Sequence, residues 1–124
     1  MNTIDTSQFY GTEAYHKVSH LPYVLTDGAK YIADKAGAYW LMDAIASHVL
    51  TTPAIWESQF AVATLDVDRK DNTATLTIDD GDGRVLARQE IEYTDYPEDQ
   101  RQLYLCYQPG GTEFDWVLML PSEY

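Results

Sequence analysis

The apolar residues that follow position 24 recur with the period of an α-helix. One helical face would be shared by Leu25, Ala29, Ile32, Ala33 and Ala36. Thr26 or Asp27 can cap the start of this helix, because a short oxygen-bearing side chain accepts hydrogen bonds from the first backbone N–H groups. Gly37 offers a C-terminal cap or a kink. The pattern predicts helix over residues 26–50, with an interruption near Gly37.

The segment AYWLMDAIASHVL, residues 38–50, is apolar on most sides of a helix and leaves Asp43 and Ser47 as a polar stripe. Such a helix is typical of a buried, central position. It is too short for a membrane span, which needs roughly 20 apolar residues. His48 lies near its end, where a cation is favoured by the helix dipole. Residues 51–53, Thr-Thr-Pro, are expected to end it.

From residue 58 the hydrophobic period changes to two, which predicts β-strands. The expected strands are Phe60–Asp68, Thr73–Asp79, Val85–Tyr93, Leu103–Gln108 and Phe114–Leu120. The DDGDG run at 79–83 predicts a hairpin turn, because Asp-Gly pairs supply the positive φ that such turns need. We therefore predict an α+β fold: N-terminal helices packed on one face of a C-terminal antiparallel sheet of four to five strands, a meander plus a hairpin.

The same alternation assigns side chains to the two faces of the sheet. In the third strand, Val85, Ala87, Ile91 and Tyr93 are expected to point inward. The residues expected to be largely buried are Trp40, Leu41, Ile45, Leu76, Ile78, Ile91, Leu105 and Leu118.

Length and composition indicate a single domain over residues 1–124, with 45% hydrophobic residues. This content excludes a disordered acidic tail, which would be poor in apolar residues. A lone cysteine, Cys106, excludes an intramolecular disulfide. The N-terminal sequence lacks the basic start and apolar run of a signal peptide, so a cytoplasmic location is expected.

Charge narrows the choice of partners. The chain has 20 acidic and 8 basic residues, a net charge of −12, of which residues 66–124 carry −9. Direct binding to nucleic acid or to an anionic membrane is disfavoured, because both need Lys and Arg. A basic protein surface is the favoured partner, although the acidity can also serve solubility alone. The oligomeric state stays open.

Several blocks resemble an uncharacterised bacterial domain-of-unknown-function family found on chromosomes and mobile elements. They are LTDGAKYIADKAGAYWLMDAIASH at 25–48, the DDGDG turn, QEIEYTDYP at 89–97, LYL at 103–105 and LPSEY at 120–124. The resemblance covers nearly the whole chain and implies one intact domain with no assigned activity. The link to mobile elements suggests, by analogy, a role against host defences.

The acidic residues of the sheet half are the predicted partner-binding site. On the strands these are Asp66, Asp68, Asp79, Glu90 and Glu92, which should project on one side. The adjoining turns add Asp80, Asp82, Asp95, Glu98 and Asp99. Spaced carboxylates on a rigid sheet could imitate the phosphates of a duplex, and Arg88 on the same face would weaken the imitation. The alternative is an ordinary solvated face.

A metal or catalytic site is the competing hypothesis. If residues 13–20 were helical, Glu13, His16 and His20 would share a face, although their set of metal ligands is incomplete. Asp79, Asp80 and Asp82 are predicted to form a hairpin turn instead of a calcium loop, because the strand pattern resumes at once.

No catalytic residue, metal or cofactor is predicted. Cys106 could act as a nucleophile with a histidine as base, but its position inside a strand favours a buried, inert side chain. We predict a non-enzymatic acidic interaction protein, a candidate blocker of a basic nucleic-acid-binding surface in a host-defence protein. The alternative is a small metal- or ligand-binding protein or enzyme that uses Glu13, His16, His20 or a pocket near Asp43.

Overall fold

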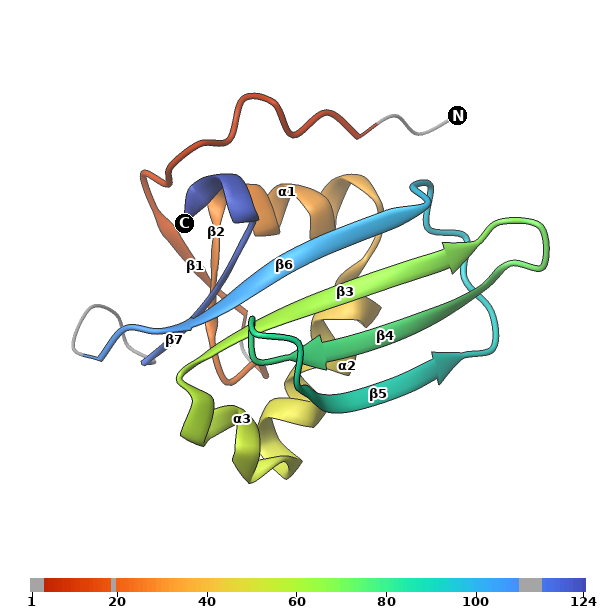
Figure 1. Ribbon diagram of the computed structural model, residues 1–124. Helices are drawn as coiled ribbons and strands as arrows, with labels where there is room; N and C mark the ends of the chain where they lie inside the picture. Colours follow the sequence, from red (N-terminus) through yellow and green to blue (C-terminus); the bar gives the residue numbers. More distant parts are fainter. Residues whose placement is uncertain (1–3, 19, 110–114) are drawn as a thin grey trace.

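The computed structural model of the protein describes residues 4–18, 20–109 and 115–124, which form one seven-stranded sheet with α-helices packed on it (Figure 1). The strands are β1 (Tyr15–Lys17), β2 (Val24–Thr26), β3 (Phe60–Asp68), β4 (Thr73–Asp79), β5 (Val85–Ile91), β6 (Gln100–Tyr107) and β7 (Trp116–Met119). The helices are α1 (Asp27–Lys35), α2 (Tyr39–Thr51), α3 (Pro53–Ser58) and a terminal 3₁₀ turn, η1 (Pro121–Glu123). The strand order is β1-β2-β7-β6-β3-β4-β5.

Helices α1 and α2 confirm the helical pattern and its interruption. Thr26 caps α1, its side-chain oxygen accepting from the Ala29 N–H at 3.3 Å. The helix stops before Gly37, whose φ of +60° lies in the left-handed region that favours glycine. The expected end at residues 51–53 is correct for α2, but Pro53 also begins α3, because a proline at the first helical position loses no hydrogen bond.

The meander and the last hairpin are confirmed. Strands β3, β4 and β5 pair antiparallel in sequence order, and β6 pairs antiparallel with β3 and with β7. Strand β6 begins at Gln100, three residues before its expected start at Leu103. The described part of β7 begins at Trp116, and the expected strand residue Phe114 lies outside the described residues.

The expectation of a purely antiparallel sheet of four to five strands is wrong. Two short strands, β1 and β2, precede the helices, and β2 pairs parallel with β7. The helices therefore sit between β2 and β3 in the chain instead of at its N-terminus. All three residues of β2 are buried, so the segment shows no alternation that could reveal it. The helix considered for residues 13–20 is also wrong, because Tyr15–Lys17 is strand.

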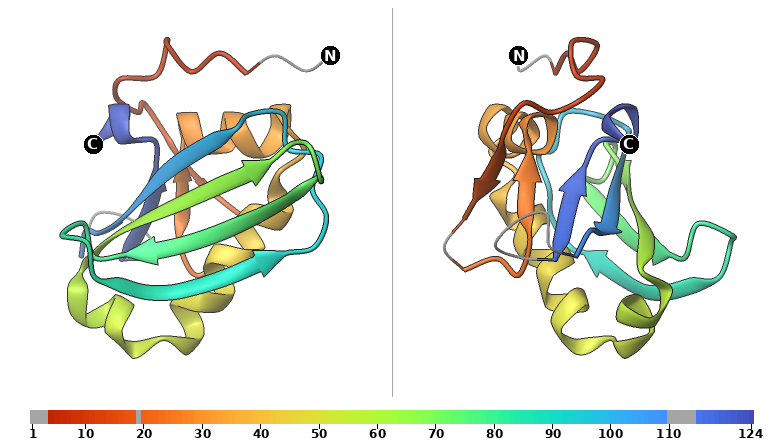
Figure 2. Two further views of the ribbon diagram at one scale, coloured as in Figure 1. Left: turned by 45° about the vertical axis from the view of Figure 1, so that its right-hand side comes forward. Right: turned by 90° about the vertical axis from the view of Figure 1, so that its left-hand side faces the viewer.

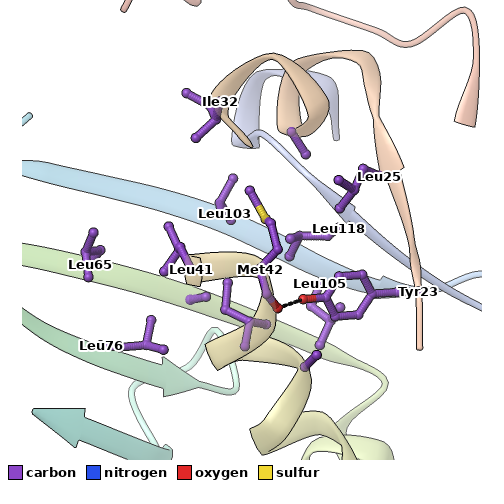
Figure 3. Packing of buried hydrophobic residues seen from close by; sticks show 14 of the residues in the cluster. Tyr23, Leu25, Ile32, Leu41, Met42, Leu65, Leu76, Leu103, Leu105 and Leu118 are labelled. Atoms are coloured by element: carbon purple, nitrogen blue, oxygen red, sulfur yellow. Dashed lines mark hydrogen bonds between the residues drawn. The ribbon is translucent and has the colours of Figure 1, made fainter. Parts of the chain in front are cut away.

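Helices cover one face of the sheet and leave the other face of β3–β6 open to the outside (Figures 1 and 2). On the covered face lies one large core, which contains Leu41, Met42, Leu65, Leu76 and Leu105 (Figure 3). The hydroxyl of the fully buried Tyr23, the residue before β2, donates to the carbonyl of Met42 in α2. The predicted core is confirmed except for Trp40 and Ile91, which are half-buried.

Two expected inward residues of the third strand are exposed instead. The register shifts beside Ile78 and Asp79, so Val85 pairs with Asp79 and is 57% exposed. Tyr93 follows the end of β5 and is 71% exposed. A β-bulge adds one residue to a strand and turns the side chains beyond it to the other face. The alternation of apolar and polar residues along the strand does not predict this bulge.

The C-terminal segment is clasped to the N-terminus of α1. Glu123 accepts hydrogen bonds from the Thr26 hydroxyl at 2.6 Å and from the Gly28 and Leu120 N–H groups, each at 2.9 Å. A carboxylate is favoured there by the helix dipole. A Cβ at Gly28 would lie 2.5 Å from a Glu123 oxygen and 2.5 Å from a Leu120 methyl carbon. Glycine is thus required by the close approach of the two segments, which we call the Glu123 clasp.

No helix within the described residues is both long enough and apolar enough to cross a membrane.

Candidate functional site

The open face of β3–β6 carries a polar row that runs across four strands. Gln100, Asp66, Thr75 and Glu90 are successive cross-strand neighbours on β6, β3, β4 and β5. Gln100 Nε2 donates to Asp66 Oδ1 at 2.6 Å, and Thr75 Oγ1 donates to Glu90 Oε2 at 3.0 Å. The row is fixed by the sheet and its own hydrogen bonds, and it presents two carboxylates to solvent. We call it the acidic row.

A neutral and basic row lies beside the acidic row. Its members are Gln102, Thr64, Thr77 and Arg88. Arg88 Nε reaches back to Glu90 Oε1 at 3.2 Å, and both side chains are about two-thirds exposed. An exposed pair of this kind contributes little to stability. It does reduce the local negative charge, as expected of a basic residue on this face.

The remaining predicted acids of the open face lie at the edge of the acidic row. Asp68 ends β3 and is exposed, and its Oδ1 accepts from the Lys70 and Asp71 N–H groups at 3.0 and 3.3 Å. Glu92 directly follows β5 and is exposed. The acidic end of the open face therefore comprises Asp66, Asp68, Glu90 and Glu92.

The acids of the β4–β5 turn lie at the opposite end of the strands. Asp79 Oδ1 accepts from the Gly81 N–H at 2.7 Å, and Asp80 Oδ1 accepts from the Asp82 and Arg84 N–H groups at 2.8 and 3.1 Å. The backbone bond from Asp82 lowers the pKa of Asp80 below its usual value. Asp79 is four residues along β4 from Thr75, so the turn begins about 13 Å from the acidic row. The hairpin turn is confirmed, and two of its three carboxylates hold the turn.

The acids of the β5–β6 connection are mostly paired with bases. Glu98 accepts from Arg101 at 2.9 and 2.6 Å and from the Tyr96 hydroxyl at 2.6 Å. Tyr96 is buried, and burial raises the pKa of its hydroxyl. Asp99 faces Arg69 at 3.5 Å, and Asp95 is exposed. Glu98 thus fastens the loop to the sheet, which leaves Asp95 and Asp99 as its exposed carboxylates.

An aromatic cluster occupies the open face at the far end from Asp66 and Asp68. The rings of Phe60, Tyr104 and Tyr124 contact one another, with centroids 5.1 to 5.5 Å apart. Tyr124 is 76% exposed. These residues come from β3, β6 and the C-terminus, so no spacing in the sequence links them. Sequence reasoning missed this cluster.

The candidate metal residues contact separate carboxylates. His16 Nε2 lies 2.8 Å from Asp27 Oδ1, whereas His20 pairs with Asp43. Glu13 meets Asp27 through its backbone N–H at 2.9 Å, which with the His16 contact lowers the pKa of Asp27. Within the described residues, no three His, Cys, Asp or Glu side chains are placed to hold a metal ion. These contacts fasten the N-terminal segment to α1 and α2.

The polar stripe of α2 faces outward. Asp43 and Ser47 are both exposed, and Ser47 donates to the Ala44 carbonyl at 2.8 Å. Asp43 is not among the residues that line the hollows beside Tyr96, Gly11 and Ala54. His48, in the last turn of α2, has Nε2 2.8 Å from Gln89 Oε1 of β5. The end of the helix is thereby tied to the edge of the sheet.

Cys106 is buried in a second apolar cluster with Val24, Val117 and Met119. Desolvation raises the pKa of its thiol to about 11, so thiolate is scarce at neutral pH. A nucleophilic role would need the opposite shift.

We expect Cys106 in the folded protein to react with iodoacetamide at pH 8 at least about 100-fold more slowly than a free cysteine, because the thiolate is depleted and shielded. Labelling followed by mass spectrometry measures the rate, and the same protein in denaturant is the control. Equal rates in the folded and unfolded protein would contradict this assignment.

The fold and the open face define an α+β protein with a mixed sheet, which helices cover on one side and which presents an acidic and an aromatic end on the other. The chain belongs to DUF6876, a family of unknown function, whose model matches residues 3–124. The resemblance to an uncharacterised domain-of-unknown-function family is thus confirmed. Searches of the curated proteins and of the solved structures find no match.

Two of the blocks that carry the resemblance meet in the Glu123 clasp. The start of the block at 25–48 supplies Thr26 and Gly28, and the LPSEY block supplies Leu120 and Glu123. These two blocks therefore supply the residues that join the C-terminal segment to α1.

Proposed function

We propose that this protein is a non-enzymatic interaction protein that binds a basic protein surface through the open face of its sheet. The observation that carries the proposal is the one-sided covering of the sheet, which leaves the acidic end, Asp66, Asp68, Glu90 and Glu92, exposed on a rigid face. Residues 66–124 add a long-range field, since they carry −9 of the net −12. Complementary charge of this kind sets association rate and partner choice.

The aromatic cluster supplies the uncharged part of such an interface. Tyrosine offers a large apolar ring with a polar tip, and aromatic anchors are enriched among the residues that dominate binding energy. Tyr124, 76% exposed, is the accessible member of the cluster. The acidic end would attract the basic surface of the partner, and the aromatic end would pack against apolar groups of the partner. The two ends would together form one contact along the open face.

We further propose that the partner is a nucleic-acid-binding protein, with host-defence proteins as the first class to test. Carboxylates and phosphates are both anionic, so a surface that binds a duplex also attracts a spaced row of acids. Asp79, Asp80 and Asp82 lie at the turn at the other end of the strands, and Asp95, Glu98 and Asp99 lie in the β5–β6 connection, so these six lie outside the acidic end of the open face. Asp66, Asp68, Glu90 and Glu92 are therefore the residues we assign to the partner.

Neutralising these four acids, as Asp66→Asn, Asp68→Asn, Glu90→Gln and Glu92→Gln, is expected to abolish capture of a partner from bacterial lysate while the fold persists. The amides keep an acceptor oxygen for the turn and row hydrogen bonds, and exposed charges contribute little to stability. For the identified partner, association should slow steeply between low and physiological salt, where the Debye length is about 8 Å. The wild-type protein should displace a DNA duplex bound to that partner.

The matched control neutralises four acids outside the sheet, Asp5, Glu13, Asp34 and Glu57. If both sets weaken binding equally, net charge alone is responsible and the open-face site is wrong. If neither set does, the acidity serves solubility.

A further inference from the structure

Strand β5 forms one edge of the sheet within the described residues. It spans Val85–Ile91, is paired with β4 on one side, and ends the strand order. An edge strand presents a row of backbone N–H and C=O groups that a further strand can pair with. The opposite edge, β1, has only three residues, whereas β5 has seven and contains no proline. Of the two edges within the described chain, β5 is the better template.

The body of β5 is held in regular geometry. Its pairing with β4 runs without interruption from Ala87 to Ile91, and the bulge lies before this segment. From the helix side, His48 of α2 contacts Gln89 at 2.8 Å. A strand that is already ordered loses little conformational entropy when it gains a partner.

Two antiparallel copies of β5 have complementary side chains when Gln89 of one copy lies opposite Gln89 of the other. If a second copy of β5 lies antiparallel with Gln89 opposite Gln89, Arg88 faces Glu90 of the other copy, and Glu90 faces its Arg88. Both side chains are about two-thirds exposed on the open face. On the helix face the same register sets Ala87 opposite Ile91, both half-buried. Opposite charges in cross-strand positions are favourable, and like charges there are unfavourable.

Neighbouring registers lack this complementarity. Centring the pair on Arg88 places arginine opposite arginine, and centring it on Glu90 places glutamate opposite glutamate. Charges on an edge strand normally discourage unwanted pairing, and here they leave one register in which every charge meets its opposite. We propose that two copies of this protein associate through β5, antiparallel about Gln89, to form one continuous sheet.

The charges of the two whole molecules act against this contact. Each chain carries −12, so the copies repel each other at long range, and added salt screens that repulsion. The Arg88–Glu90 contacts are short-range and number two per dimer by symmetry. Moderate salt is therefore expected to favour dimer formation, the opposite of its expected effect on a basic partner.

The test is a charge swap measured by analytical ultracentrifugation. The wild-type protein should approach twice its chain mass of 14.1 kDa as concentration rises. Arg88→Glu or Glu90→Arg alone should weaken dimerisation about tenfold, because two attractive pairs become repulsive. The double variant should restore it. Lys70→Glu and Asp71→Arg, the same charge changes in the exposed β3–β4 turn, are the controls and should leave it unchanged.

A protein that stays monomeric at its highest soluble concentration would overturn the proposal. If the single charge reversals leave dimerisation unchanged, or if the double variant does not restore it, the contact lies elsewhere. Either result would overturn the assignment to β5. The outcome is separable from the proposed partner binding, because Arg88→Glu makes the open face more acidic and should not weaken a basic partner.

Discussion

Replacing Leu41 with alanine is expected to lower the free energy of unfolding by about 2–5 kcal/mol. Leu41 lies on α2 at 1% exposure, in the core between this helix and the covered face of the sheet (Figure 3). The truncation loses the transfer free energy of the removed carbons and leaves a cavity, since the surrounding strands cannot close over it. Denaturant titration followed by circular dichroism measures the change.

Leu50→Ala is the matched control, the same truncation on the same helix. Leu50 is 65% exposed, so its replacement should change stability by no more than about 0.5 kcal/mol. If the two variants lose similar stability, α2 does not bury the face that contains Leu41.

Breaking the Glu123 clasp is expected to have a comparable effect, with Glu123→Ala lowering the free energy of unfolding by about 2–4 kcal/mol. The substitution leaves the Thr26 hydroxyl and two backbone N–H groups without their acceptor, and removes a carboxylate from the N-terminus of α1. Glu57→Ala, at an exposed position on α3, is the control and should be nearly neutral.

Gly28→Ala tests the same clasp from the other side. Its new Cβ would collide with Glu123 and Leu120, each at 2.5 Å, so it should destabilise the fold by about 1–3 kcal/mol or more. The double variant Gly28→Ala, Glu123→Ala should lose less than the sum, because one collision disappears with the glutamate. Strict additivity would show that Gly28 and Glu123 do not meet.

The open face could be predicted only in part. Asp66, Thr75 and Glu90 each follow from strand alternation, but their union in one row depends on the register of three strands. Register is set by the packing of the opposite face and by the turns, which the pattern of one strand does not contain. The structural role of Glu98 could not be predicted for the same reason. Its partner Arg101 is half-buried only because the loop packs against the sheet.

Several elements could be predicted because the residues that specify them are adjacent in the chain. A helix start at Thr26 or Asp27, the break at Gly37, the strands Phe60–Asp68 and Thr73–Asp79 and the DDGDG turn each follow from a few adjacent residues. These features depend on side-chain period and backbone preference, which act within one or two turns of chain.

The contacts between distant segments became visible only in the folded chain. The parallel pairing of β2 with β7, the Glu123 clasp and the aromatic cluster of Phe60, Tyr104 and Tyr124 all join positions far apart in the chain. Their energies come from packing, burial and hydrogen bonds that exist only once the sheet has formed. A buried strand of three residues such as β2 is stabilised by pairing with its neighbour in the sheet. It is too short to show a hydrophobic pattern from which a strand could be predicted.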